Sequence, residues 1–156
     1  MVLFLVQTGI GCVYTGFVDP NNPVVKLCIR GLKAENRGDI ESANHSFALA
    51  WDARESDLDS CIAAHYFARH QPKPELALFW NQEALNFARK VNDTRVDSFF
   101  PSLYINLARS YEQVGDKAEA NKYFTLAATD INDTAVGSYG LMLRESIKAG
   151  QNRTGS

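Results

Sequence analysis

The chain has 156 residues, of which 46% are hydrophobic and 22% are charged, as in a single soluble globular domain. Its formal net charge of −2 gives no bulk attraction for nucleic acid or for an anionic membrane surface, so neither partner is expected. Its three cysteines, Cys12, Cys28 and Cys61, are odd in number and widely spaced. This argues against a disulfide framework or a metal site and favours a reducing, cytoplasmic compartment.

Residues 1–18 form an apolar N-terminal extension without lysine or arginine. The segment therefore lacks the basic start of a secretory signal. Polar residues and glycines from Gln7 to Gly11 interrupt it well before the roughly 20 apolar residues of a membrane-spanning helix. We expect a cytoplasmic protein, with export through this segment as the alternative. The segment itself is left open as native, cleaved or a mis-called start.

Two segments, Gly38–Ala50 and Gly115–Ala127, align without gaps and both read G-D-x3-A-N-x2-F-x-L-A. The glycine suits the left-handed position that ends one helix, and the aspartate after it caps the next helix. In the second segment Glu119 adds a capping-box signal. The glycines lie 115 − 38 = 77 residues apart, which leaves room for one further repeat of about 34 residues and a short insertion.

The predicted elements form a domain over residues 19–150, with repeats at about 24–56, 57–91 and 101–134. In the second repeat we expect helices at about 58–70 and 75–91, the latter beginning at Pro74. A polar loop at 92–100 precedes Pro101 and the third repeat. A capping helix is predicted at about 134–149, followed by a disordered polar tail at 151–156.

The third repeat carries Tyr104, Leu107, Ala108 and Tyr111, followed by Ala120, Phe124 and Ala127. This order resembles the tetratricopeptide repeat pattern over residues 23–149. The resemblance implies an all-α fold: a right-handed α-α superhelix of about three helix pairs with a C-terminal capping helix. In this family the first helices of successive repeats line a concave binding surface.

Further stretches, at residues 22–28, 61–71, 80–85 and 101–104, resemble a group of small bacterial tetratricopeptide proteins of unassigned function. Some of its members carry an rRNA adenine methyltransferase label. The sequence does not support that label, because it has no strand–GxGxG–helix unit and no Asn-Pro-Pro-aromatic loop. No cofactor is expected.

Placing the helices in the repeat frame predicts the residues of the concave groove. Cys61, His65 and Arg69 share one helical stripe at i, i+4 and i+8. Arg109 and Gln113 take the matching positions in the third repeat. The predicted peptide-binding residues are Asn36, His65, Arg69, Asn106, Arg109, Gln113, Cys61 and Leu32, with Cys28 and Ile105 in the apolar floor. Arginine forks pair with carboxylates, so an acidic peptide is the expected ligand.

Other interpretations concern single residues of this region. Cys61 and His65 are spaced for a thiolate–imidazole pair, but the sequence shows no third orienting group, and a buried thiol beside a satisfied histidine is the preferred interpretation. Asn81 falls where the other repeats have Phe47 and Phe124, and we expect it to bond to the helix of residues 58–70. The chaperone-tail clamp of the family needs Lys and Asn where this chain has Cys28 and Leu32, so a chaperone tail is not expected.

The sequence therefore predicts a non-enzymatic adaptor or scaffold that binds a protein or peptide in its groove. One alternative is a self-associating structural protein, in which residues 1–18 cover a groove. The other alternative is an enzyme or an RNA- or nucleotide-linked accessory protein that uses His65 and Arg69.

Overall fold

The computed structural model describes residues 18–131 and 137–155, and within them the only regular secondary structure is helix, with no strand. This confirms the predicted all-α class for that part of the chain. The helices are α3 (Pro23–Asn36), α4 (Ile40–Asp52), α5 (Asp57–Phe67), α6 (Pro74–Ala88), the short 3-10 helix η1 (Thr94–Phe99), α7 (Phe100–Gln113), α8 (Lys117–Asp130) and α9 (Gly137–Thr154). None of the described helices has the length and apolar character needed to cross a membrane.

The glycine–aspartate pairs end and begin helices as predicted. Gly38 and Gly115 have φ values of 79° and 87°, in the left-handed region that glycine tolerates. The side chain of Asp39 accepts a hydrogen bond from the backbone N–H of Ser42 at 3.0 Å, and Asp116 accepts one from Glu119 at 3.0 Å. Glu119 itself pairs with Lys122, so only one half of the predicted capping box is formed.

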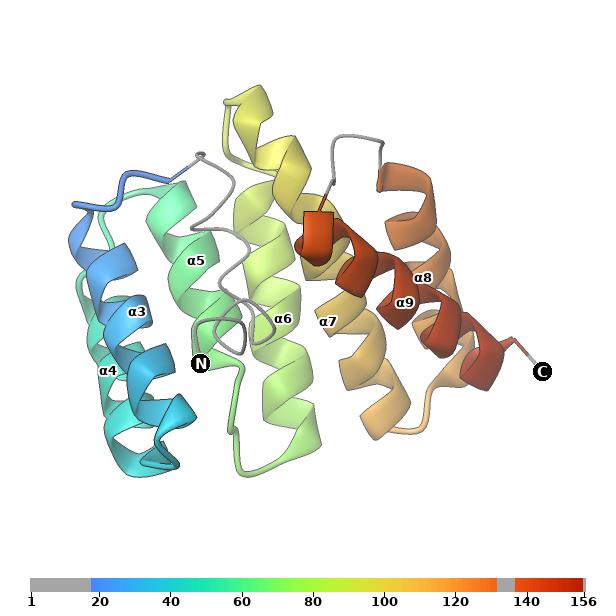
Figure 1. Cartoon of the computed structure of the whole chain (residues 1–156), viewed down its shortest axis with the longest axis horizontal. Coiled ribbons are helices and arrows are strands. Elements are labelled where there is room, and N and C mark those ends of the chain that lie inside the picture. The colour runs from blue at the N-terminus through green and yellow to red at the C-terminus, as the bar shows by residue number, and fades with distance from the viewer. Residues whose placement is uncertain (1–17, 132–136, 156) are drawn as a thin grey trace.

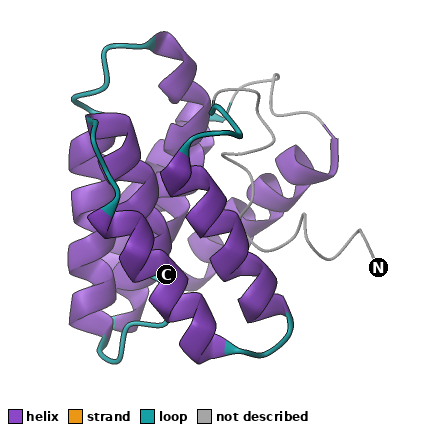
Figure 2. Ribbon diagram, turned by 90° about the vertical axis from the view of Figure 1, so that its left-hand side faces the viewer, coloured by secondary structure: helices purple, strands orange, loops and turns teal. Residues whose placement is uncertain are grey.

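The helices pack in consecutive pairs, α3 with α4, α5 with α6 and α7 with α8 (Figure 1). Each later pair packs against the pair before it, through α5 on α4 and through α7 on α6. Helix α9 packs on both α8 and α7, in the way that α5 packs on both α4 and α3. Figure 2 shows the short loops between the helices from α3 to α8.

The core depends on small residues that let aromatic rings lie between helices. Ala43 and Ala50 on α4 are completely buried, and Phe47 between them stacks on Tyr66 of α5 with ring centroids 5.8 Å apart. A Cβ atom at Gly31 would lie 2.3 Å from the ring of Phe47. Close packing of this kind leaves no room for a larger residue.

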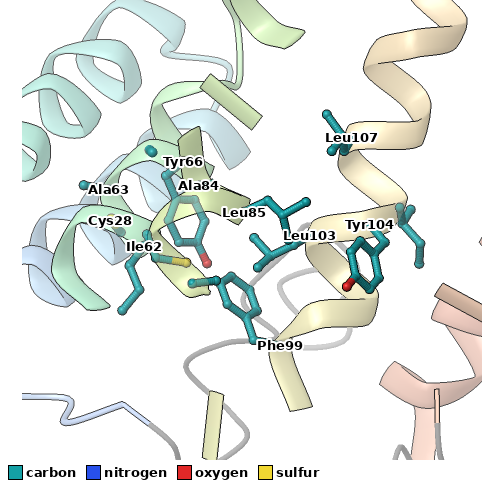
Figure 3. Packing of buried hydrophobic residues seen from close by; sticks show 14 of the residues in the cluster. Cys28, Ile62, Ala63, Tyr66, Ala84, Leu85, Phe99, Leu103, Tyr104 and Leu107 are labelled. Atoms are coloured by element: carbon teal, nitrogen blue, oxygen red, sulfur yellow. The ribbon is translucent and has the colours of Figure 1, made fainter. Parts of the chain in front are cut away.

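The core continues without a break into the third pair. Figure 3 shows Tyr66 of α5 and Leu85 of α6 beside Leu103 of α7, with Phe99 of η1 below them. Part of the predicted polar loop at 92–100 is a 3-10 helix, and its Val96 and Phe99 side chains are buried, each 3% exposed. Its apolar residues close the core between α5 and α7.

The C-terminal helix differs from its prediction. It continues through Thr154, so residues 151–154 are helical rather than a disordered tail. Arg153 pairs with Glu112 of α7 at 2.9 Å and Thr154 is buried, which explains why the helix does not end at residue 149. Its predicted start near 134 and residues 1–17 lie outside the described residues.

Candidate functional site

Two adjoining hollows lie along the first helices of the pairs. The central hollow has a volume of about 360 Å³ and is lined by α5, α6 and α7. The outer hollow has a volume of about 320 Å³ and is lined by α5, α7 and α9. Both hollows share the same four lining residues, which are His65, Arg69, Asn106 and Arg109.

Five of the eight predicted groove residues therefore lie together, the four shared ones and Gln113 of the central hollow. The other three do not join them. Leu32 and Cys61 are 0% exposed and belong to the hydrophobic core, and Asn36 is exposed at the end of α3. The hollows therefore include stripe residues of α5 and α7, whereas Leu32 and Cys61 face the core and Asn36 faces solvent away from both hollows.

Arg69 is held by a carboxylate that the sequence alone does not reveal. Its Nη2 donates to Oε1 of Glu35 at 2.7 Å and its Nε donates to Oε2 at 3.2 Å. His70, which has a φ of 49° just beyond α5, places its Nε2 at 2.9 Å from Oε1 of the same glutamate. The charge of Arg69 is thus compensated within the protein. Glu35 lies 34 residues away, in the last turn of α3, so only a contact between pairs reveals it.

Arg109 has a different environment. Its Nη2 donates to the hydroxyl of Ser146 on α9 at 3.1 Å, and it forms no ion pair among the described residues. The nearby Glu112 is already engaged by both Nε and Nη2 of Arg153, each at 2.9 Å. Partial burial in the groove wall lowers the pKa of Arg109, and the charges of Arg153 and Arg69 lower it further, against the opposing effect of Glu112. Arginine remains protonated at neutral pH, so the hollows contain a cation that favours an anion.

His65 is a buried, neutral donor at the floor of both hollows. It is 3% exposed, and Nδ2 of Asn106 donates to its Nδ1 at 3.3 Å. An amide nitrogen can only donate, so the ring proton lies on Nε2. Burial, aided by the charge of Arg69, lowers the pKa of His65 to about 3. The hydrogen-bond partner of the ring at Nδ1 is thus an amide.

Asn81 has a different hydrogen-bond partner from the one that the sequence predicts. At corresponding positions of the second helices, Phe47 packs on Tyr66 of α5 and Phe124 packs on Gly150 of α9. Asn81 instead donates to Oγ of Ser110 on α7 at 2.9 Å. The expected bond to α5 is therefore wrong, because the Asn81 amide faces Ser110 on α7, the first helix of the next pair. A small amide replaces the aromatic ring at this junction, and the central hollow opens beside it.

The surrounding chemistry is polar and lacks convergent metal ligands. Among the described residues no group of three or more His, Cys, Asp or Glu side chains comes together as a metal site requires. Hydroxyls from Ser102 and Tyr139, which are 2.7 Å apart, lie on the outer wall. Such a site can pair with charged and hydrogen-bonding groups of a ligand.

Comparison with protein-family models, with curated proteins and with solved structures found no match for this chain.

Proposed function

We propose that this chain is a tetratricopeptide-type binding module, a right-handed superhelix of three helix pairs closed by α9. The repeat pattern, its glycine–aspartate boundaries and the stepwise packing of the pairs support this arrangement. Helix α9 packs where the first helix of a fourth pair would lie, as a capping helix should. The module acts as a non-enzymatic adaptor.

Its ligand is an acidic segment of a partner protein, bound along the two hollows. The observation that carries this proposal is Arg109, a groove cation whose only hydrogen-bond partner among the described residues is the hydroxyl of Ser146. A carboxylate of the ligand forms an ion pair with Arg109, which corresponds to the ion pair that Arg69 already forms with Glu35. Asn106 and the outer hydroxyls provide further hydrogen bonds.

A peptide array tests this proposal directly, because it samples many ligand sequences at once. Each spot carries seven-residue peptides with one fixed residue among random neighbours. The wild-type chain should retain peptides with a fixed Asp or Glu more strongly than those with Lys or Ala. Hydrogen bonds to charged groups contribute about 1.5–3 kcal/mol. Arg109→Gln should therefore weaken retention of acidic peptides by roughly 10- to 100-fold.

Arg30→Gln is the matched control, because Arg30 is exposed on α3 and lines neither hollow. It should bind acidic peptides as the wild type does. Equal loss of binding in Arg30→Gln and Arg109→Gln would show a general charge effect and contradict a specific site. Retention of acidic peptides that is unchanged in Arg109→Gln would also contradict the proposal.

A further inference from the structure

The central hollow contains two buried polar side chains whose hydrogen bonding is incomplete. Asn81 is 7% exposed and uses its Nδ2 on Ser110, which leaves its Oδ1 without a partner among the described residues. His65 is 3% exposed and uses its Nδ1 on Asn106, which leaves its Nε2–H without a partner in the same part of the chain. Both residues line the same hollow. Buried polar groups almost always have hydrogen-bond partners, so we look for a ligand group that bonds to both side chains.

This ligand group has a definite chemistry, since one side chain offers an acceptor and the other a donor. A carboxylate offers no donor to Asn81, and an ammonium group offers no acceptor to His65 and lies near Arg69 and Arg109. An alkyl group leaves both buried atoms unsatisfied. A carboxamide carries an acceptor oxygen and a donor nitrogen, and it is neutral, so its burial needs no counter-ion.

The central hollow results from small residues at the junction of α6 and α7. Phe47 and Phe124 fill the corresponding junctions, whereas Asn81 and the small side chain of Ser110 meet at this one. The remaining volume of about 360 Å³ holds a side chain the size of glutamine. Ala68 and Ala77 on its walls add no bulk to the opening.

We infer that the central hollow is a specificity pocket that takes the carboxamide side chain of Asn or Gln from a bound peptide. This inference rests on the proposed binding of an acidic peptide, and it adds a second determinant beside the carboxylate at Arg109. The ligand motif is then an acidic residue near an amide residue. Arg109 lines both hollows, so one peptide can reach both subsites.

The test uses acidic peptides from the array, synthesised singly with Gln, Asn, Glu, Leu or Ala at each position in turn. Titration calorimetry with the full chain should find one position where Gln or Asn binds about tenfold more tightly than Ala, or about 1.4 kcal/mol. In Asn81→Ala this preference should disappear, and in His65→Phe it should fall in the same way. Asn86→Ala, an exposed residue on the same helix, should keep it.

The outcomes separate the two proposals. Failure of every acidic peptide to bind overturns the proposed function and this inference with it. Acidic binding without a preference for Gln or Asn at any position overturns this inference alone and indicates that water satisfies Asn81 and His65. A preference that survives in both folded variants, as judged by their melting curves, also overturns it.

Discussion

Acidification should destabilise the protein through His65. The side chain is neutral and buried in the folded chain, with a pKa of about 3 against 6.5 for an exposed histidine. Between these two values the unfolded chain binds a proton that the folded chain does not. Stability is therefore fully present above pH 6.5 and is lost as the pH falls toward 3. The slope is about 1.4 kcal/mol per pH unit, so this one group removes about 3 kcal/mol between pH 7 and pH 4.

That loss is large against the roughly 5–15 kcal/mol by which domains are usually stable. Urea unfolding at several pH values measures it, and His65→Phe isolates it, because phenylalanine keeps a ring among Tyr66 and Phe99 but does not titrate. Carboxylates titrate equally in both proteins, so the difference between the two curves reports the histidine.

The wild type should lose stability more steeply than His65→Phe below pH 6.5. His45→Gln, which changes an exposed histidine, should follow the wild type. Parallel curves for the wild type and His65→Phe between pH 6.5 and pH 4 would contradict this prediction, because they would show that His65 accepts a proton as easily in the folded chain as in the unfolded chain.

Three further changes test the packing and the charges. Asn81→Ala removes a buried hydrogen bond and should lower stability by about 1–3 kcal/mol, measured by urea unfolding; an unchanged midpoint would contradict the bond to α7. Gly150→Ala places a methyl carbon 2.2 Å from the Phe124 ring and should cost about 1–3 kcal/mol, whereas Lys148→Ala on the exposed side of α9 should melt like the wild type. Glu35→Gln releases the charge of Arg69 toward the hollows and should tighten acidic-peptide binding several-fold in calorimetry; weaker binding would show that Arg69 needs its partner for position.

Helix boundaries could be predicted because they depend on local chemistry. Gly38 and Gly115 take left-handed φ values, and Asp39 and Asp116 cap the helices that follow, so each signal lies within a few residues of its effect. Burial of the alanines and of Phe124 follows from helical spacing alone. The all-α class and the order of helices therefore needed no tertiary information.

The charge balance of the site could not be predicted in the same way. Glu35 neutralises Arg69 across two helix pairs, and nothing near Arg69 in the sequence indicates this contact. Helical spacing also placed Leu32 and Cys61 on the groove stripe, whereas both are completely buried in the structure. The stripe shows which residues share a direction, and packing between helices decides which of them remain accessible.

Small departures from the repeat pattern proved to be informative. Asn81 at an aromatic position marked the junction where the central hollow opens, although its partner is Ser110 rather than a residue of α5. The tail was predicted wrongly because the ion pair of Arg153 with Glu112 joins residues 41 apart and extends α9. Such contacts join residues far apart in the sequence, so the repeat pattern alone does not predict them.

Nuclear magnetic resonance with an acidic peptide from the array can observe the proposed binding of an acidic ligand in the hollows along α5 and α7. The side-chain amide signals of Asn106 and Gln113 and the Nε–H signal of Arg109 should shift on titration, because these groups line the hollows. The side-chain signals of Asn44 and Asn152, which are exposed and line neither hollow, should stay in place. Shifts at Asn44 or Asn152 with none at Asn106, Arg109 and Gln113 would contradict binding in the hollows.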